Sequence, residues 1–238
     1  MTKHPSKRQE SATIFLQDKM RQDWDNRARE NAYHYISSGR DDWNLEAFLA
    51  TGERVIAEEV LSDMGNVCQG TPPAALRVLE IGCGAARLTR ALATVFGEVH
   101  GVDVSDEMIR LARGNLEHLP NVHLHANNGA DLAFLANASF DFAFSYLVFQ
   151  HISSRLIIEN YVREVSRVLK PGSLFKFQLQ GDPKSEPRDD DTWLGQPYSV
   201  EQAADLAADC GFELRHHRGL GTQYFWLWFF KISGKPTD

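Results

Sequence analysis

The stretch Val78-Leu79-Glu80-Ile81-Gly82-Cys83-Gly84-Ala85-Ala86-Arg87 decides the fold, together with Asp103, which follows 21 residues after Gly82. An apolar run that ends in an acid, then a Gly-x-Gly turn and a helix-like segment, is typical of a strand whose carboxyl end faces a helix N-terminus. The next apolar run ends in Asp103, whose carboxylate is suited to bind the two hydroxyls of a ribose. These features predict a site for a nucleoside cofactor.

The glycines of this turn restrict the kind of cofactor. Gly82 and Gly84 have no Cβ, so the main chain can turn tightly and lie close to a ligand. The third glycine of the dinucleotide fingerprint is absent, because Ala86 and Arg87 follow instead. The sequence also contains no Gly-Lys-Ser/Thr phosphate loop. The expected cofactor is therefore a nucleoside without a phosphate chain.

The composition narrows the class of protein. Of the 238 residues, 43% are apolar and 24% are charged, which is enough for a sizeable core, and the net charge of −7 argues against a nucleic-acid partner. Cys68, Cys83 and Cys210 lie far apart and show no metal spacing, so neither a disulfide framework nor a bound metal is expected. No apolar run approaches the ~18 residues that span a bilayer. We therefore expect a cytoplasmic protein without a membrane partner, either a monomer or a homodimer.

The chain is expected to have three parts. Residues 1–10 are polar and are predicted to form a disordered tail. Apolar residues then recur at helical spacing, which predicts an N-terminal helical cap over residues 11–70. A Gly-Thr-Pro-Pro segment marks the join to a domain that covers residues 71–238.

Strands and helices alternate in this domain, which indicates an α/β fold with a mostly parallel sheet and helices on both faces. The last strand follows its predecessor after a short turn and is expected to be its antiparallel hairpin partner. Strands are predicted near residues 76–81, 98–103, 121–126, 139–146, 173–180, 211–217 and 223–231, and helices near 86–96, 106–117, 153–169 and 199–209.

A polar stretch over residues 181–197 is longer than a typical strand-to-helix loop. It leaves the carboxyl end of a predicted strand, where open α/β sheets bind their ligands. We interpret it as a mobile lid; the alternative is a solvated loop without a role in binding.

Four segments together resemble the successive motifs of class I S-adenosylmethionine (SAM)-dependent methyltransferases, over roughly residues 76 to 232. They are Val78 to Gly84, Gly101 to Ile109, Ser139 to Ser145 and Arg167 to Gly172. The N-terminal aromatic segments Trp24 to Arg29 and Tyr33 to Ile36 are similar to a cap found in bacterial small-molecule methyltransferases of this class. The resemblance implies a Rossmann-like seven-stranded sheet, SAM as the cofactor and methyl transfer to a small molecule.

The resemblance also assigns roles within the cofactor site. Glu80 would order the glycine turn and face the amino group of the methionine moiety, and Asp103 would bind the ribose. Cys83 is expected to pack in the turn rather than to act as a nucleophile, since no base is placed beside it. The other expected cofactor contacts are Gly82, Gly84, Val104, Met108, Asn128, Gly129, Tyr146 and Gln150.

Adenine recognition departs from the family's pattern. Asn128, followed by Gly129, stands where many members carry an acid. An amide can accept from the adenine amino group and donate to a ring nitrogen. Either Asn128 or Asp131 is expected to make this contact.

Three residues are candidates for the chemistry. His151 could act as a general base, because its ordinary pKa lies near neutrality; alternatively it is a helix-start residue bonded to a backbone carbonyl. Tyr146 lies at the rim over the transferable methyl group. Tyr33, or Tyr35, could stabilise the sulfonium through a cation–π contact, or could simply pack the cap helix onto the sheet.

Two rivals to methyl transfer stay open at this level. An enzyme of the same fold could cyclise SAM to azetidine-2-carboxylate and release methylthioadenosine. A non-catalytic protein could bind SAM without reaction.

Overall fold

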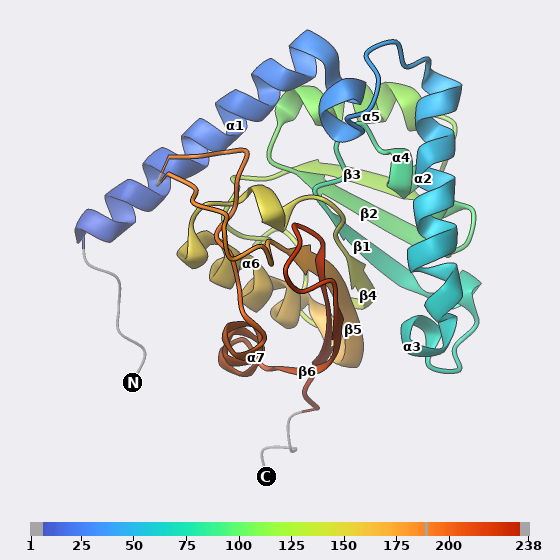
Figure 1. Ribbon diagram of the computed structural model, residues 1–238. Helices are drawn as coiled ribbons and strands as arrows, with labels where there is room; N and C mark the ends of the chain where they lie inside the picture. Colours follow the sequence, from blue (N-terminus) through green and yellow to red (C-terminus); the bar gives the residue numbers. More distant parts are fainter. Residues whose placement is uncertain (1–6, 189, 234–238) are drawn as a thin grey trace.

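The computed structural model describes residues 7–188 and 190–233, with the side chains of the first helix described from Thr13 onward. Its centre is a seven-stranded sheet in the order β3-β2-β1-β4-β5-β7-β6 (Figure 1). The strands are β1 (Arg77–Ile81), β2 (Glu98–Asp103), β3 (Val122–Ala126), β4 (Phe140–Phe144), β5 (Leu169–Leu179), β6 (Phe212–Arg218) and β7 (Phe225–Lys231).

The pairing confirms the predicted fold class. Neighbouring strands from β3 to β5 are parallel, and β7 runs antiparallel to both β5 and β6. Strand β5 begins at Leu169 rather than near residue 173, because Leu169 already pairs with Phe140 before an irregularity in the register.

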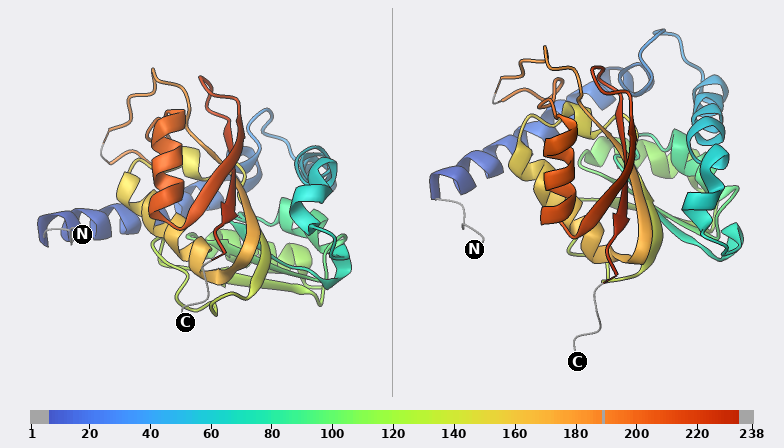
Figure 2. Two further views of the ribbon diagram at one scale, coloured as in Figure 1. Left: turned by 90° about the horizontal axis from the view of Figure 1, so that it is seen from below. Right: turned by 60° about the horizontal axis from the view of Figure 1, so that its bottom comes forward.

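Helices cover both faces of the sheet (Figure 2). Helices α6 (Arg155–Val168) and α7 (Val200–Asp209) pack on the face that contains Leu79 and Ile81 of β1. Helices α2 (Leu45–Glu59) and α4 (Arg87–Ala93) pack on the opposite face, against Val78. The other helices are α1 (Lys7–Ile36), α3 (Met64–Cys68) and α5 (Asp106–Leu116). Within the described ranges, no helix is long and apolar enough to cross a membrane.

Helix α1 differs from the sequence prediction at its start. Residues 1–6 of the expected tail lie outside the described residues, and α1 begins at Lys7, four residues before the predicted start of the helical cap. Lys, Arg, Gln and Glu are good helix formers, and they extend a helix whose later turns pack on α5. Asn31 interrupts α1 with extended backbone angles (φ −165°, ψ 82°).

Helix α1 is fastened to the sheet domain at the start of α5. Ser105 caps α5 by accepting from the backbone N–H of Met108. Asp25 of α1 accepts from the Ser105 hydroxyl at 2.6 Å and from the Glu107 N–H at 3.1 Å. A carboxylate at a helix N-terminus is also favoured by the helix dipole. These contacts hold the cap helix beside the end of β2.

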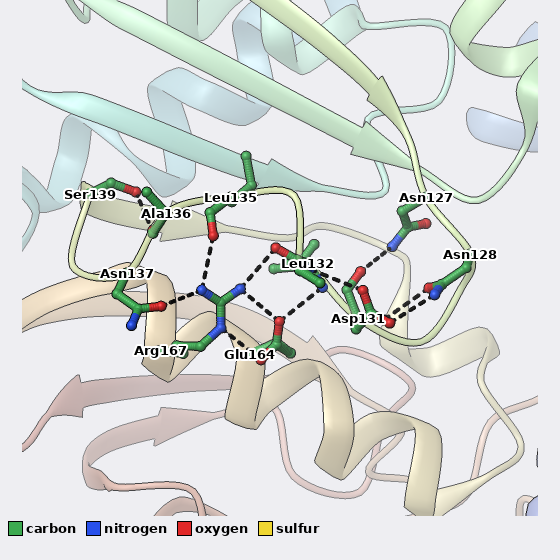
Figure 3. A network of polar contacts seen from close by, with 11 residues as sticks. Asn127, Asn128, Asp131, Leu132, Leu135, Ala136, Asn137, Ser139, Glu164 and Arg167 are labelled. Atoms are coloured by element: carbon green, nitrogen blue, oxygen red, sulfur yellow. Dashed lines mark hydrogen bonds and ion pairs between the residues drawn. The ribbon is translucent and has the colours of Figure 1, made fainter.

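The connection from β3 to β4 contains no helix in the part of the chain that is described. Arg167 of α6 organises this loop, donating to the carbonyls of Leu132 and Leu135 and to Glu164 (Figure 3). Guanidinium-to-carboxylate bonds are among the stronger hydrogen bonds in proteins. The hydrogen bonds of Arg167 therefore hold this loop against α6.

Candidate active site

One cavity opens at the carboxyl ends of β1, β2 and β4. Its empty space is about 1320 Å³, a volume that includes open solvent at the mouth. Ten of the residues expected from the sequence line it: Glu80, Gly82, Cys83, Gly84, Asp103, Val104, Met108, Tyr146, Gln150 and His151.

Asp103 is held at the end of β2 by two backbone donors. The N–H of Gly84 donates to Oδ2 at 2.8 Å, and the N–H of Ser105 donates to Oδ1 at 2.9 Å. These bonds fix the carboxylate between the glycine turn and the start of α5. Loss of solvent raises the pKa of Asp103 to about 6, although the two bonds act in the opposite direction. A bound ligand that donates to this carboxylate would favour its ionised form.

Glu80 is fully buried at the end of β1. Its Oε2 accepts from the Thr89 hydroxyl of α4 at 2.6 Å. Burial raises the pKa of Glu80 to about 7, opposed by the Thr89 bond and by the nearby charge of Arg87. This carboxyl is therefore poised to ionise when a cationic group enters the cavity.

The glycine turn serves packing as well as ligand approach. Gly82 and Gly84 both have positive φ, at 74° and 53°. A Cβ on Gly82 would fall 2.1 Å from a methyl carbon of Val148, and one on Gly84 would fall 2.8 Å from Ile36 of α1. Because neither glycine has a Cβ, Val148, which follows β4, and Ile36 of α1 can pack directly against the turn.

Cys83 lies buried in the same turn. Burial, followed by the charges of Asp103 and Glu80, raises its pKa well above the ordinary value. A thiol held protonated is a poor nucleophile. The environment of Cys83 therefore agrees with the packing role.

Asn128, which was predicted to contact the adenine, does not line the cavity. Its side chain accepts from the N–H groups of Ala130 and Asp131 and donates to the Asp131 carboxylate, so it stabilises the turn (Figure 3). Asn127 lines the cavity instead. Asn128 and Gly129 are not among the lining residues, although Gly129 lies against Val104, which is one.

Two buried polar side chains, those of Gln150 and Arg87, line the cavity. Gln150 is 5% exposed, and its Oε1 is a buried acceptor with no hydrogen-bond partner among the described residues. Arg87, also 5% exposed, donates to the Thr51 hydroxyl at 3.1 Å, and its guanidinium lies 5.5 Å from the centre of the Tyr146 ring. Because an unpaired buried acceptor is costly, Gln150 indicates a donor on a ligand.

His151 lies between aromatic rings at the mouth of the cavity. Its ring centroid is 4.9 Å from that of Trp193 and 5.6 Å from that of Trp24. Nδ1–H donates to the carbonyl of Trp193, so in the neutral ring Nε2 is the unprotonated nitrogen and can accept a hydrogen bond. Desolvation lowers the pKa of His151 to about 4, which keeps the imidazole neutral near pH 7.

The loop over residues 181–197 is docked onto α1 rather than standing free in solvent. Thr192 donates to Asp23 at 2.6 Å and accepts from Arg27, while the Arg27 guanidinium lies 5.2 Å from the centre of the Trp193 ring. Gly195 donates to the Gln150 carbonyl at 2.7 Å. Trp193 and Leu194 thereby form one wall of the cavity.

Tyr33 does not reach the cavity lining. Its ring stacks on Phe48 of α2, with centroids 4.2 Å apart and an interplanar angle of 19°. Tyr35, two residues later, lines the cavity and contacts Trp193 edge-on. The interruption of α1 at Asn31 means that regular helical spacing does not decide which tyrosine faces the site.

The expected site residues did not include Arg87, Trp24, Trp193 or Asn127. Arg87 had a signal in the sequence, because it stands at the third-glycine position of the dinucleotide fingerprint. Trp24 and Trp193 lie in the predicted cap and lid, but no local pattern predicted their contact, which joins residues 169 positions apart.

The arrangement is that of the class I SAM-dependent methyltransferases: a seven-stranded sheet with an antiparallel β7 and a cavity at the strand ends. Residues 78–172 match the family model described as the methyltransferase domain.

Relatives support this assignment over part of the chain. A demethylmenaquinone methyltransferase of Tropheryma whipplei is 33% identical over 95 residues, which cover 40% of this chain and 38% of that protein. A ubiquinone biosynthesis O-methyltransferase of Xanthomonas campestris is 32% identical over 109 residues, which cover 45% and 44%. The chain therefore spans less than half the length of these curated relatives.

Solved structures extend the similarity in fold to almost the whole chain. Geranyl diphosphate C-methyltransferase from Streptomyces coelicolor, in complex with Mg²⁺, geranyl diphosphate and S-adenosylhomocysteine, superposes with a TM-score of 0.65. Its sequence is 14% identical, and the match covers 91% of this chain and 98% of that one. At this identity the similarity concerns the fold.

Proposed function

We propose that this protein transfers the methyl group of SAM to a small-molecule acceptor. The observation that carries the proposal is one cavity lined by a fixed carboxylate at the end of β2 and by a set of buried polar side chains. The carboxylate is that of Asp103, and the buried polar side chains are those of Glu80, Arg87 and Gln150. This set complements a molecule that joins a nucleoside to a charged amino acid.

The residues fit SAM in one orientation. Asp103 would accept from both ribose hydroxyls in charge-assisted bonds. Glu80 and the unpaired Oε1 of Gln150 would accept from the methionine ammonium group, and Arg87 would face its carboxylate. Val104 and Met108 would contact the adenine, with Asn127 as the nearest lining amide.

The acceptor would enter between the cap and the lid. Tyr35, Trp24 and Trp193 form an aromatic wall there, which favours a flat, apolar small molecule. The named relatives act in quinone biosynthesis, which is consistent with such an acceptor. A cytoplasmic location and a monomeric or homodimeric state stay predictions.

Bound SAM would supply an electrophilic methyl group: the acceptor atom bonds to the methyl carbon in line with the C–S bond, and that bond breaks to release S-adenosylhomocysteine. The protein's task is then to align the acceptor within about 3–3.5 Å and to exclude water. Tyr146 and the lid residues Trp193 and Leu194 would do this. His151 would accept the acceptor's proton at Nε2, since Nδ1 is engaged with the loop carbonyl.

Product analysis tests this proposal. Purified protein is incubated with SAM, with and without a panel of phenolic and other small acceptors, and products are identified by mass spectrometry. S-adenosylhomocysteine together with a methylated acceptor supports methyl transfer. Methylthioadenosine from SAM alone would instead support the cyclisation, and tight SAM binding without any product would support a non-catalytic role.

A further inference from the structure

A second cluster of side chains lies at the end of β2 opposite to Asp103. Glu98 begins β2, His100 follows on the same face, and His123 of β3 pairs with His100 in the strand register. Because a strand rises ~3.3 Å per residue, Glu98 lies about 16 Å from Asp103 along β2. The cluster is thus separate from the candidate active site and independent of the proposed function.

Three ligand atoms meet in this cluster. Glu98 Oε1 lies 2.6 Å from His100 Nε2 and 3.5 Å from His123 Nε2. All three atoms lie within 4.8 Å of one another. A tetrahedral zinc ion with bonds of ~2.0–2.1 Å holds its nitrogen and oxygen ligands about 3.3 Å apart. The two distances from Glu98 each differ from this spacing by less than about 1 Å.

A fourth residue orients the buried ligand. His125 Nε2 lies 3.1 Å from His100 Nδ1, and the two rings stack with centroids 5.2 Å apart. Metal-binding histidines usually bond through their other ring nitrogen, which fixes the ring. His100 is 5% exposed, whereas the side chains of Glu98 and His123 are 38% and 46% exposed. Solvent can therefore reach the cluster and complete the coordination of an ion.

Arg77 competes with any cation at this cluster. Its Nε donates to Glu98 Oε1 at 3.0 Å, and its Nη2 lies 3.0 Å from His100 Nε2. The guanidinium also lies 4.8 Å from the centre of the Phe140 ring. An ion can bind only when the guanidinium leaves these two atoms, and the 35% exposure of the side chain leaves room for this movement.

We propose that Glu98, His100 and His123 bind a divalent transition-metal ion, best matched by Zn²⁺, and that binding displaces Arg77. Two imidazoles and one carboxylate form a ligand set that zinc commonly takes, with solvent in the fourth position. Such an ion would link β2 to the edge strand β3.

Metal titration of untagged, chelator-treated protein tests this. Calorimetry with Zn²⁺ and visible absorption with Co²⁺ should show one ion per chain. Glu98→Gln and His123→Ala each remove a proposed ligand and should weaken binding by at least ~10–100-fold, the range for losing only a group that orients a ligand. Arg77→Met, which keeps an unbranched side chain beside Phe140 but removes the competing charge, should tighten binding by about tenfold.

The matched control is His118→Ala, which removes an exposed histidine outside the cluster and should leave the affinity unchanged. Three outcomes would overturn the proposal. They are no binding, equal affinities of the His118→Ala and His123→Ala variants, and a sulfur-to-cobalt charge-transfer band, which would assign the ion to a cysteine.

Discussion

At the scale of single residues, the site depends on two carboxyl groups that the fold keeps away from water. Burial raises the pKa of Asp103 to about 6 and that of Glu80 to about 7, from ordinary values of 3.8 and 4.5. In the ligand-free protein, the folded state therefore holds these protons more tightly than the unfolded chain. Their contribution to the free energy of unfolding declines as the pH rises from about 4 to about 7.

Ligand binding should show the opposite dependence on pH. The affinity for S-adenosylhomocysteine should rise as the pH increases through about 6 to 7, because the ionised carboxylates accept stronger, charge-assisted hydrogen bonds than the protonated carboxyls do. Asp103→Asn should lower the affinity at neutral pH by about 10–100-fold, since a bond to a charged group contributes ~1.5–3 kcal/mol. It should also flatten the step near pH 6.

Calorimetric titrations across this pH range make the measurement. Asp106→Asn is the matched control, since Asp106 is exposed at the start of α5 and lies outside the cavity lining. An unchanged affinity in the Asp103→Asn variant would contradict the ribose assignment.

His151 allows a second prediction at this scale. If its Nε2 accepts the acceptor's proton, His151→Gln should lower kcat by ~10²-fold or more while leaving the affinity for S-adenosylhomocysteine unchanged. Glutamine can still donate to the Trp193 carbonyl, so the loop contact is kept. Steady-state kinetics with an identified acceptor make the test. A rise in KM at constant kcat would assign His151 to positioning of the loop.

At the scale of elements, the site is closed by two segments that are distant in the sequence. Helix α1 and the loop over residues 181–197 meet through Thr192 and Trp193. The loop also bonds to the segment after β4 through Gly195. Opening of this contact would expose the acceptor wall without disturbing the sheet.

Thr192→Val tests this contact. The variant keeps the shape of the side chain but loses the bonds to Asp23 and from Arg27, a loss of about 1–2 kcal/mol. Hydrogen exchange within residues 181–197 should therefore become about tenfold faster in the ligand-free protein. Glu186→Gln changes an exposed residue of the same loop and serves as the control. Equal exchange rates in both variants would show that the hydrogen bonds of the Thr192 hydroxyl do not hold the loop on α1.

At the scale of the whole molecule, the sheet, the cap helix and the loop surround one cavity. A ligand that binds only the folded protein stabilises it by mass action, by ~2.7 kcal/mol at 100 times its Kd. For a chain of this size, that corresponds to a rise in Tm of about 5–10 °C.

S-adenosylhomocysteine should produce this rise in Tm in a thermal denaturation experiment. ATP or NAD at the same concentration should not, because the chain lacks the third glycine of the dinucleotide fingerprint and a Gly-Lys-Ser/Thr phosphate loop. A larger shift with NAD would contradict the choice of cofactor.

The sequence could predict most of the fold because the signals are local. Every predicted strand and helix of the sheet domain exists, and the boundaries differ mainly where long-range pairing intervenes, as at Leu169. That Glu80 and Asp103 line one cavity was also predictable, because strand ends in a parallel sheet meet at one edge. The cluster of Glu98, His100 and His123 was not, since its ligands come from two strands and only their register brings them together.

The amino-acid sequence by itself thus determined the sheet, the glycine turn and the acids that identify the cofactor site, because each depends on short-range patterns. Only the tertiary structure decided that Asn127 rather than Asn128 lines the cavity, that Tyr35 rather than Tyr33 does so, and that Trp193 closes the site. These outcomes depend on an interrupted helix, a turn that uses its own side chains, and a loop docked on a distant helix. The periodicity of a sequence does not encode such contacts.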